Sequence, residues 1–502
     1  MKPVLSSAES YLLDNKIIIN DKITDKNLMD RAGKGIAHFI IENIQNPFEK
    51  DFIVIAGPGK NGNDAIICHY YLLQFGVHST LLLCNEKQKN NWTFSKYSID
   101  NSLISVYDNT YSFSDDHWYI DGIFGIGLNR PIKGHYKDVI ANLNSVNNII
   151  SIDIPSGIDS NAGNTKGISI NASLTLAVGW LKLGYFFNDA LDKTGEINII
   201  DLGLNSKYDL DQYIQYLDNY DIINIAPRKL NNIDKYSRGR VLSITGSTMY
   251  PGACYLAVNA ALRAGAGIVK AVIPESQKDL FEQLLIEPIV VPIDDDENGV
   301  FKIDEIDEII DEMNWPDVII FGSGLSTALD NVNWMKIILK SVTKPLILDG
   351  SGFLPFIEGK LEIDELPLDT ILTPHYFEFS RLFNIDINKV KNHPIEAARA
   401  ASDKLNSRIL ILKGPTTIII TSDKKEYIIN HNNSLLATAG SGDVLTGILG
   451  SLISQGLSKD NAALYGTFIH GKTSSIYCDQ INSGGMIASD IISLLPEAME
   501  IN

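Results

Sequence analysis

The fold of this chain is constrained most by an alternation of short apolar runs with segments of helical spacing, which occurs twice along its 502 residues. Such an alternation is typical of a parallel sheet with helices packed on both faces. We therefore predict an α/β protein. In the first half a helix is expected from Asp64, and strands are predicted within residues 51–57, 79–84, 117–122, 147–157 and 173–179.

The two series are separated by residues 201–240, where apolar residues are scattered and a Pro227-Arg228 pair interrupts the pattern. We place the domain boundary at about residue 225, which gives domains of residues 1–225 and 226–502. Because no fixed period links the halves, two different α/β domains are expected rather than one repeated unit. The strands of the second series are predicted within residues 239–246, 267–274, 317–324, 344–350, 370–375 and 407–414.

Composition narrows the class of protein. The chain is 45% hydrophobic and 21% charged, which is ordinary for globular domains. No run reaches the roughly 18 apolar residues of a membrane helix, and the N-terminus lacks the apolar core of a signal peptide. We expect a soluble cytoplasmic protein. Neither a zinc site nor a disulfide framework is suggested by the widely spaced Cys68, Cys84, Cys254 and Cys478.

The formal net charge is −19, and Lys and Arg do not cluster, which argues against nucleic-acid binding. A phosphate-bearing ligand would have to rely on backbone amides and a few local cations. Lys413 and Arg130 are candidates for such cations.

One turn of the second series, Thr438–Leu445 (TAGSGDVL), places an acidic residue directly after a Gly-Ser-Gly sequence. Gly440 and Gly442 allow the backbone to turn so that successive amides face one anion. Apolar residues at helical spacing follow, so the turn opens a helix whose positive end faces the same point. Asp443 would then suit accepting a proton from a hydroxyl that is being phosphorylated. The turn alone fits an ordinary Asp at a helix N-terminus equally well.

Five other strand ends of this half are marked by Gly or Pro, and ligands collect at the carboxyl ends of parallel strands. Together with the TAGSGD turn they predict one edge that holds both a nucleotide and a substrate. These strand ends are residues 246–253, 322–326, 349–353, 373–379 and 412–417.

Single residues at this edge allow two interpretations each. Lys413 follows an apolar run, so it either contacts a phosphate or caps a strand. His375 precedes an amphipathic helix and is either a polar cap or a substrate contact. Glu378 and Asp349 are either structural or linked to a metal.

The second half resembles the ADP- or ATP-dependent NAD(P)H-hydrate dehydratases, which have a ribokinase-like α/β fold. The resemblance covers most of residues 228–502. Its motifs occur here in the order of the family, at Met249–Ala253, Arg263–Val269, Thr373–His375, Leu412–Gly414 and Thr438–Leu445.

This resemblance implies an enzyme that phosphorylates the hydroxyl of the S form of hydrated NADH or NADPH and then expels phosphate to restore NAD(P)H. Asp443 would be the base, magnesium the cofactor, and ADP or ATP the co-substrate. By motif position, the hydrate would contact Ala253, Gly324, His375 and Asp443. The nucleotide would contact Lys413, Gly414, Pro415, Thr416, Thr417 and Gly442.

Three oxygen-rich strand ends lie in the first half: the glycine-rich turn 56–65 (AGPGKNGNDA), Asp121 and Asp153. The turn joins a strand to a helix, so its amides can form a second anion site. On one sheet edge, the three would form a pocket for a cation and a polar ligand. Taken singly, each Asp also fits a loop cap.

Residues 5–215 resemble the NAD(P)H-hydrate epimerases, which have a three-layer Rossmann-like fold and are often fused to the dehydratase. The resemblance implies that Asp153 is the base that interconverts the R and S hydrates, and that Asn61, Asp121 and Ser156 hold a potassium ion. The hydrate site would be lined by Lys60, Asn61, Gly62, Asn63, Asp64, Gly125, Ile126, Gly127, Leu128, Asn129, Arg130, Pro131 and Asp153.

This chain has Asn63 and Ala65 where the epimerase family usually has glycines. They would restrict the turn if it required positive φ, although Asn tolerates that region.

The leading hypothesis is therefore a bifunctional repair enzyme whose partners are NADHX, NADPHX and ADP or ATP, and which forms a homo-oligomer. One alternative is a ribokinase-like small-molecule kinase, because the Gly-Ser-Gly-Asp site would serve both reactions. In another, the first domain binds nucleotides or proteins without catalysis. The sequence leaves open the preference between ADP and ATP and between the two hydrates.

Overall fold

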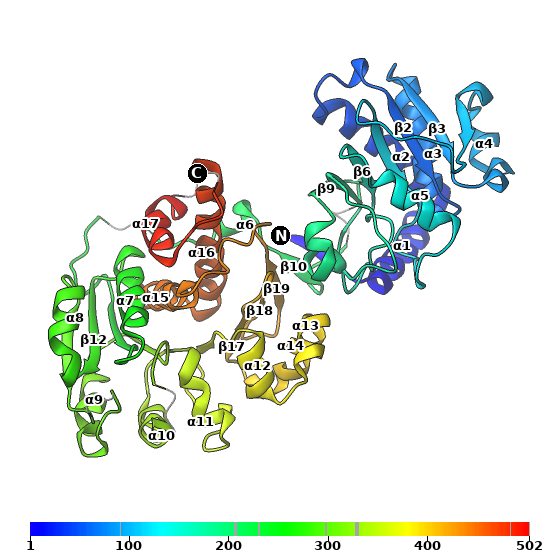
Figure 1. Cartoon of the computed structure of the whole chain (residues 1–502). Helices are drawn as coiled ribbons and strands as arrows, with labels where there is room; N and C mark the ends of the chain where they lie inside the picture. Colours follow the sequence, from blue (N-terminus) through cyan, green and yellow to red (C-terminus); the bar gives the residue numbers. More distant parts are fainter. Residues whose placement is uncertain are drawn as a thin grey trace. The chain divides into compact units, whose positions relative to one another are not determined.

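The computed structural model describes residues 1–90, 92–204, 208–228, 231–296, 299–326, 331–481 and 483–500. They form two compact units, the first from Lys2 to Ile214 and the second from Gln215 onward. Each unit is built around a largely parallel sheet (Figure 1). Within the described ranges, no helix combines the length and the apolar character needed to cross a membrane.

The main sheet of the first unit has the strand order β4-β3-β2-β5-β6-β7-β9. Its strands are β2 (Phe52–Ala56), β3 (Ser79–Leu83), β4 (Ile104–Val106), β5 (Trp118–Gly122), β6 (Ile149–Ile152), β7 (Leu174–Val178) and β9 (Glu196–Ile200). Outside it, β1 (Lys2–Leu5) pairs in parallel with β8 (Leu181–Lys182). The helices are α1 (Ser7–Asp21), α2 (Asp25–Asn43), α3 (Lys60–Gln74), α4 (Trp92–Tyr97) and α5 (His135–Leu143).

Apolar side chains of the first sheet point alternately to two cores, as the period of two in a strand requires. Val54 packs with residues of α2 and α3, whereas Ile55 packs with residues of α5. Burial on both faces explains why the strands read as continuous apolar runs. The predicted three-layer α/β architecture and the strand in each apolar run are confirmed.

Helix α3 begins at Lys60, earlier than the predicted start at Asp64. Asn63 and Ala65 therefore lie inside a helix, and neither has positive φ. The restriction expected from replacing glycines at these positions does not arise. Gly62 is the glycine that close packing requires, because a Cβ there would lie 1.9 Å from the carbonyl oxygen of Gly57.

The sheet of the second unit runs in the order β13-β12-β11-β14-β15-β16-β17-β18-β19-β10. Its predicted strands are confirmed as β11 (Arg240–Ile244), β12 (Ile268–Pro274), β14 (Val318–Phe321), β15 (Leu346–Leu348), β16 (Thr370–Leu372) and β17 (Ile409–Leu412). The sequence analysis did not predict β10 (Ile214–Tyr216), β13 (Ile289–Ile293), β18 (Thr417–Ile420) and β19 (Glu426–Ile429).

The strands β11 to β17 are parallel, whereas β18 pairs antiparallel with both β17 and β19. The helices of this unit are α6 (Asn219–Ile223), α7 (Pro251–Arg263), α8 (Lys278–Leu284), α9 (Ile306–Glu312), α10 (Asn331–Ser341), α11 (Leu354–Ile357), α12 (Tyr376–Phe383), α13 (Ile387–Asn392), α14 (Pro394–Leu405), α15 (Ser441–Ser454), α16 (Lys459–Ile481) and α17 (Ala488–Ala498).

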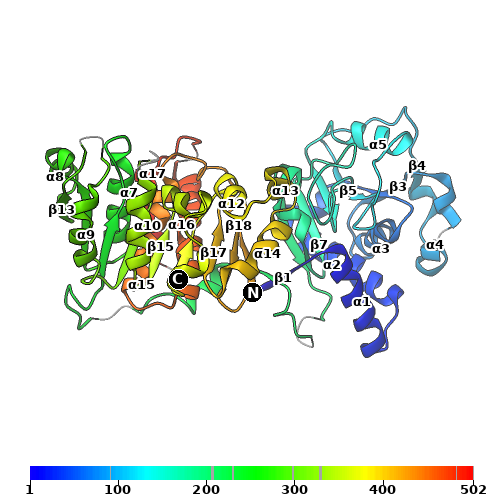
Figure 2. The same cartoon turned by 90° about the horizontal axis from the view of Figure 1, so that it is seen from below.

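Helices α7, α15, α16 and α17 pack together on one face of this sheet, and Phe281 of α8 belongs to the same core, whereas α9 to α14 lie toward the other face (Figures 1 and 2). Leu217 and Ile222 belong to the core under α15 and α16, and β10 pairs with β19. The compact units consequently divide after Ile214, whereas the sequence placed the boundary at about residue 225.

Candidate active sites

A buried ion pair marks the carboxyl ends of β14 to β17 in the second unit. Asp349 follows β15, and its carboxylate lies 2.6 Å from Nζ of Lys413, which follows β17. The same carboxylate accepts hydrogen bonds from Oγ of Ser323 (3.1 Å) and Oγ1 of Thr373 (2.7 Å). Four strand ends thus supply one polar cluster, as the topology of a parallel sheet allows.

The ion pair keeps both partners charged. Burial opposes the ionised form of Asp349, but the ammonium of Lys413 and the hydrogen bonds from Thr373 and Ser323 together outweigh it and lower the pKa of the carboxyl. Burial likewise opposes the charged form of Lys413, and the carboxylates of Asp349 and Glu378 raise the pKa of its ammonium. Lys413 therefore offers a fixed positive charge at the sheet edge.

The predicted anion-binding turn forms beside this lysine. Gly440, in the left-handed region with φ of 86°, precedes α15, whose first residue is Ser441. A Cβ on Gly442 would lie 3.0 Å from Nζ of Lys413. Because the first amides of a helix have no partner within it, this end of α15 and the ammonium can bind the same phosphate.

Asp443 lies in the first turn of α15, next to the ion pair. Burial and the negative charge of Asp349 raise the pKa of Asp443 to about 7. Burial also raises the pKa of Glu378 to about 7, with a further contribution from Asp349. Three carboxyl groups therefore surround the ammonium of Lys413, and two of them exchange protons near neutral pH.

His375 forms the polar cap that the sequence allowed. Its Nδ1 accepts hydrogen bonds from the amides of Phe377 and Glu378 at the start of α12, and Glu378 accepts from the amide of His375. The segment also pairs with Lys413, whose amide donates to the carbonyl of Pro374 at 2.9 Å. His375 is thus placed beside the ion pair, and its contact with a substrate stays a prediction.

The other predicted residues of this half lie at the same edge. Gly324 has φ of 66°, and a Cβ there would lie 2.3 Å from Cβ of Ala253, so these two predicted hydrate contacts touch. Gly414 lies against the ring of Tyr376, since a Cβ on it would approach that ring to 2.6 Å. Pro415, Thr416 and Thr417 continue into β18, and Oγ1 of Thr416 accepts a 2.7 Å hydrogen bond from Asn430.

A buried histidine that was not predicted from the sequence supports the turn. Nε2 of His470, on α16, lies 2.9 Å from the carbonyl oxygen and 3.2 Å from Oγ of Ser441. Burial lowers the pKa of His470 to about 4, so the ring is neutral at physiological pH. Its only signal in the sequence was a histidine within a helix of small and apolar residues. Ser323 and Thr373 were missed as partners of Asp349.

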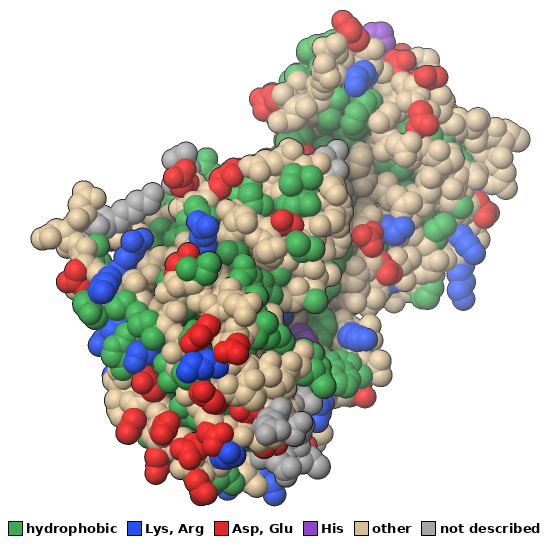
Figure 3. Space-filling view, turned by 60° about the vertical axis from the view of Figure 1, so that its left-hand side comes forward, with side chains coloured by type: hydrophobic (Ala, Val, Ile, Leu, Met, Phe, Trp, Pro, Cys, Tyr) green, Lys and Arg blue, Asp and Glu red, His purple; other side chains and the backbone are tan. Residues whose placement is uncertain are grey.

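Because the chain carries a net negative charge, local positive groups at this site matter for binding a phosphate. On the face shown in Figure 3, Asp and Glu side chains (red) gather on the lower part of the second unit, with fewer Lys and Arg (blue) among them. The mean field of a chain with net charge −19 disfavours anions. A phosphate must therefore be attracted by local groups such as Lys413 and the amides of α15.

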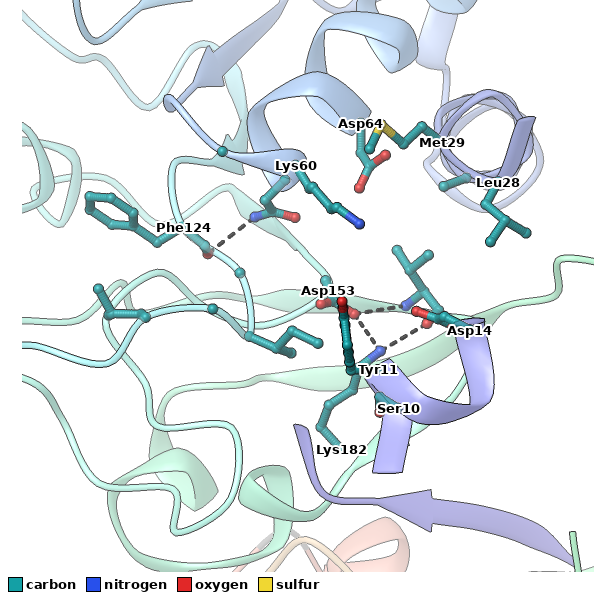
Figure 4. A pocket seen from close by; sticks show the side chains of 18 of the residues that line it. Ser10, Tyr11, Asp14, Leu28, Met29, Lys60, Asp64, Phe124, Asp153 and Lys182 are labelled. Atoms are coloured by element: carbon teal, nitrogen blue, oxygen red, sulfur yellow. Dashed lines mark hydrogen bonds and ion pairs between the residues drawn. The ribbon is translucent and has the colours of Figure 1, made fainter. Parts of the chain in front are cut away.

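The first unit contains a cavity of about 530 Å³, shown in Figure 4. Of the residues predicted from the epimerase resemblance, it is lined by Lys60, Asn61, Asp64, Gly125, Ile126, Gly127, Leu128, Asn129, Arg130 and Asp153. Gly62, Asn63 and Pro131 do not line it. Gly62 packs against Gly57, and Asn63 is buried in α3.

Asp153 is held in a strained backbone conformation at the wall of this cavity. Its φ is 66°, which is uncommon for a residue other than glycine. Its amide donates to the carbonyl of Leu176 at 2.8 Å, and its carbonyl accepts from the hydroxyl of Tyr185. Its carboxylate forms an ion pair with Lys182. Strain that the surroundings fix in this way is typical of functional residues.

The predicted potassium ligands surround a buried carboxylate. Asp121 is inaccessible to solvent and accepts hydrogen bonds from the hydroxyl of Ser156 at 2.6 Å and from its amide at 2.9 Å. Nδ2 of Asn61 donates to the carbonyl of Phe124 at 3.1 Å. The carboxylate of Asp121, the hydroxyl of Ser156 and the carbonyl of Phe124 therefore converge, with the amide of Asn61 beside them, and oxygens of this kind suit a hard monovalent cation.

Helix α1 contributes residues to the cavity that the sequence analysis did not select. Ser10, Tyr11 and Asp14 line the cavity, and Lys182 of β8 lies with them (Figure 4). The available signal was an acid on the buried stripe of a helix, because Asp14 follows buried Leu13. Across the described ranges, no three His, Cys, Asp or Glu side chains converge as a ready-made metal site.

Two family models match the chain. Residues 241–497 match the model described as NAD(P)H-hydrate dehydratase. Residues 25–184 match the model described as YjeF-related protein N-terminus. The matches fall on the two halves that carry the two sites.

Curated relatives extend over nearly the whole chain. The bifunctional NAD(P)H-hydrate repair enzyme Nnr of Dictyoglomus turgidum is 30% identical over 510 aligned residues, which cover 99% of this chain and 98% of that protein. The enzyme of the same name from Escherichia coli is 27% identical and covers 94% of this chain and 89% of its own. Among solved structures, a hypothetical protein of Streptococcus mutans is 23% identical with a TM-score of 0.50, covering 57% of this chain and 99% of its own, and shows the same fold.

Proposed function

This chain belongs to the family of bifunctional NAD(P)H-hydrate repair enzymes, and we propose that its two units perform the two reactions of that repair. The second unit would dehydrate the S form of NADHX or NADPHX at the expense of ADP or ATP, releasing AMP or ADP and phosphate. The first unit would interconvert the R and S forms. The catalytic domains would correspond to residues 1–225 and 226–502.

The observation that carries the dehydratase proposal is the meeting of Asp443, Lys413 and the N-terminus of α15 at one sheet edge. Lys413 and the free amides would bind the phosphate that is transferred. Asp443 would accept the proton of the substrate hydroxyl as its oxygen attacks phosphorus. Phosphorylation converts a poor leaving group into a good one, so phosphate leaves and the dihydronicotinamide ring is restored.

Magnesium fits this site by charge. The carboxyl groups of Asp349, Glu378 and Asp443 share a single ammonium, that of Lys413, so the ionised cluster carries excess negative charge. Magnesium usually binds through one or two carboxylates and the phosphates of its substrate. When bound, it would neutralise charge on the transferred phosphoryl group. Glu378, which is not engaged with Lys413 as Asp349 is, would hold it together with the phosphates of the nucleotide.

For the first unit, we propose that Asp153 accepts the proton of the hydrate hydroxyl in the 530 Å³ cavity. Its ion pair with Lys182 supports this role, because the buried ammonium holds the carboxyl group at the wall of the cavity. Asn61, Asp121 and Ser156 would hold potassium, whose charge would compensate the buried carboxylate of Asp121.

A coupled assay separates the dehydratase from the alternative small-molecule kinase. The full chain would be given S hydrate, ADP or ATP, and magnesium, while absorbance at the dihydronicotinamide band and free phosphate are followed together. We expect both to rise in equal amounts. A stable phosphoester with no recovered absorbance would instead support a kinase.

A second assay tests the first unit without nucleotide. The full chain would be given one pure hydrate epimer, and the ratio of epimers would be followed by chromatography. Interconversion faster than in buffer supports epimerase activity. A rate equal to that of buffer would favour a first unit that binds nucleotides without catalysis. The homo-oligomer expected from the sequence stays a prediction, which light scattering of the purified chain would test.

A further inference from the structure

Helix α1 supplies an acid to the wall of the first unit's cavity, near Asp153. Asp14 is drawn in Figure 4 on α1, on the side of the cavity where Lys182 and Asp153 lie. The residues matched by the N-terminal family model begin at 25, so α1 precedes the matched segment. The capping box of Ser6 and Glu9 fixes the start of this helix and hence the position of Asp14 within it.

Lys182 is committed to Asp153 and cannot serve as a mobile proton carrier. Its side chain is 3% exposed, and its ammonium forms the ion pair with Asp153. The same ammonium donates to the carbonyls of Val178 at 2.8 Å and Trp180 at 2.9 Å. All three donors of the ammonium are thereby used. Lys182 therefore holds the side chain of Asp153 in place.

Asp14 has the opposite character. Burial raises the pKa of its carboxyl to about 6, against the lowering effect of Lys182, and Asp153 raises it further. The charged groups that face it are Lys182, Asp153, Lys60 and Asp64. Of these, Asp64 also has a buried Oδ1 without a hydrogen-bond partner among the described residues. Asp14 and Asp153 are neighbouring carboxyl groups in different environments. Two such groups can serve as an acid and a base.

We propose that Asp14 is a further catalytic residue of the first unit. It would donate a proton when the hydrate is opened, while Asp153 acts as the base. This inference rests on the epimerase activity proposed above. It names the proton donor for a reaction in which the sequence had predicted only the base, Asp153.

The chemistry balances with these two groups alone. In the hydrate, the stereocentre carries both the hydroxyl and the ring nitrogen. Asp153 accepts the hydroxyl proton, the O–H electrons form a carbonyl, and the C–N bond breaks with its electron pair passing to nitrogen. Asp14 gives its proton to that nitrogen. After rotation about the adjoining C–C bond, nitrogen attacks the other carbonyl face, returns its proton to Asp14, and oxygen recovers the proton of Asp153.

The test compares Asp14→Asn with the unaltered full chain in the nucleotide-free epimer assay. Asn matches the neutral acid in shape but cannot release a proton. We expect kcat to fall about 100- to 10,000-fold, with KM changed by less than about threefold. Because Asp14 works as the protonated acid, kcat/KM of the unaltered chain should fall as pH rises through about 6, and this limb should vanish in Asp14→Asn.

Three controls make the outcome decisive. Asp21→Asn, at the end of the same helix, should keep the full epimerisation rate. Asp14→Glu retains a carboxyl and should recover part of the rate together with the alkaline limb. Dehydration of S hydrate, measured with nucleotide, should be unchanged in all variants, which shows that the effect of each substitution is confined to the first unit, and circular dichroism should show that each variant is as folded as the unaltered chain.

The negative results distinguish the proposed epimerase activity from the proposed role of Asp14. If the unaltered chain does not interconvert the epimers, the proposed epimerase activity fails. If it does so and Asp14→Asn is equally fast, or if Asp14→Glu is as slow as Asp14→Asn and lacks the limb, Asp14 is not the proton donor.

Discussion

Nζ of Lys413 lies 2.6 Å from Oδ1 of Asp349, and the side chains of the two residues are only 21% and 6% exposed. This ion pair joins the ends of β15 and β17 and places one positive charge beside the N-terminus of α15. We therefore expect binding of an anionic nucleotide and stability of the second unit to depend on the same contact.

Replacing Lys413 with Met should impair both properties. The buried carboxylate of Asp349 would lose its partner, which typically costs about 3–5 kcal/mol of unfolding free energy. The KM for the nucleotide should rise at least tenfold because a phosphate contact is lost. Urea unfolding and steady-state kinetics measure the two effects.

Lys424→Met is the matched control for this change. Lys424 pairs with Asp403 at 2.7 Å, but these side chains are 58% and 89% exposed. Its loss should cost less than about 1 kcal/mol. Equal destabilisation by the two substitutions would contradict a special role for the buried pair.

Asp443→Asn should abolish nucleotide-dependent dehydration while epimerisation continues. Removal of a general base typically lowers kcat about 100- to 10,000-fold, and the amide is nearly isosteric with the carboxyl. Phosphate release from S hydrate and nucleotide measures the loss, and the epimer assay reports on the untouched first unit. Near-normal dehydration in this variant would remove Asp443 as the base.

The dehydration rate should rise with pH through about 7. Burial and Asp349 raise the pKa of Asp443 to about 7, and a base must be ionised to accept a proton. The sign for stability is opposite: this raised pKa favours folding below about pH 4, and the benefit is lost as pH rises through about 7. Rate profiles and urea midpoints between pH 5 and 8 check both slopes, and a flat rate profile would argue against Asp443 as the titrating base.

Glu378 titrates in the same range, so the profile belongs to a coupled pair. The pH profiles of the dehydration rate in Asp443→Asn and in Glu378→Gln would show how much of the pH dependence each residue contributes. The residual rate should lose its dependence on pH near 7 more fully in the first variant than in the second.

His470→Ala should weaken nucleotide binding without affecting the binding of the hydrate. The ring holds the first residue of the anion-binding helix through the carbonyl of Ser441. Without it, the KM for the nucleotide should rise about three- to tenfold, whereas His470→Gln, which can still donate a hydrogen bond, should recover much of the loss. Equal KM values in all three proteins would reduce His470 to a packing residue.

Potassium should stabilise the first unit, if Asn61, Asp121 and Ser156 hold it. A ligand that binds only the folded state raises the free energy of unfolding, by about 2.7 kcal/mol at 100 times its Kd, and so raises the unfolding midpoint. The midpoint should therefore be higher in potassium chloride than in lithium chloride at equal ionic strength. Asp121→Asn should remove this difference, and its persistence in that variant would place the cation elsewhere.

The sequence by itself determined the two α/β units, their parallel strands and the Gly-Ser-Gly turn before α15. Local signals sufficed for these features, because apolar runs such as 239–246 and a Gly-Ser-Gly turn before a helical pattern act over a few neighbouring residues. Family motifs then supplied candidate residues such as Asp153 and Asp443. Their roles remain predictions.

Only the tertiary structure decided which charges meet. Lys413 and Asp349 are 64 residues apart in the sequence. Lys182 of β8, which follows β7 in the sequence, forms an ion pair with Asp153, which precedes β7. Asp14 lies on a helix for which the sequence analysis made no prediction. Such contacts depend on strand order and on how each helix packs, so pKa values and the pairing of acid with base could not be read from local spacing. The physical reason is that burial and charge act through space, whereas sequence patterns record only neighbours along the chain.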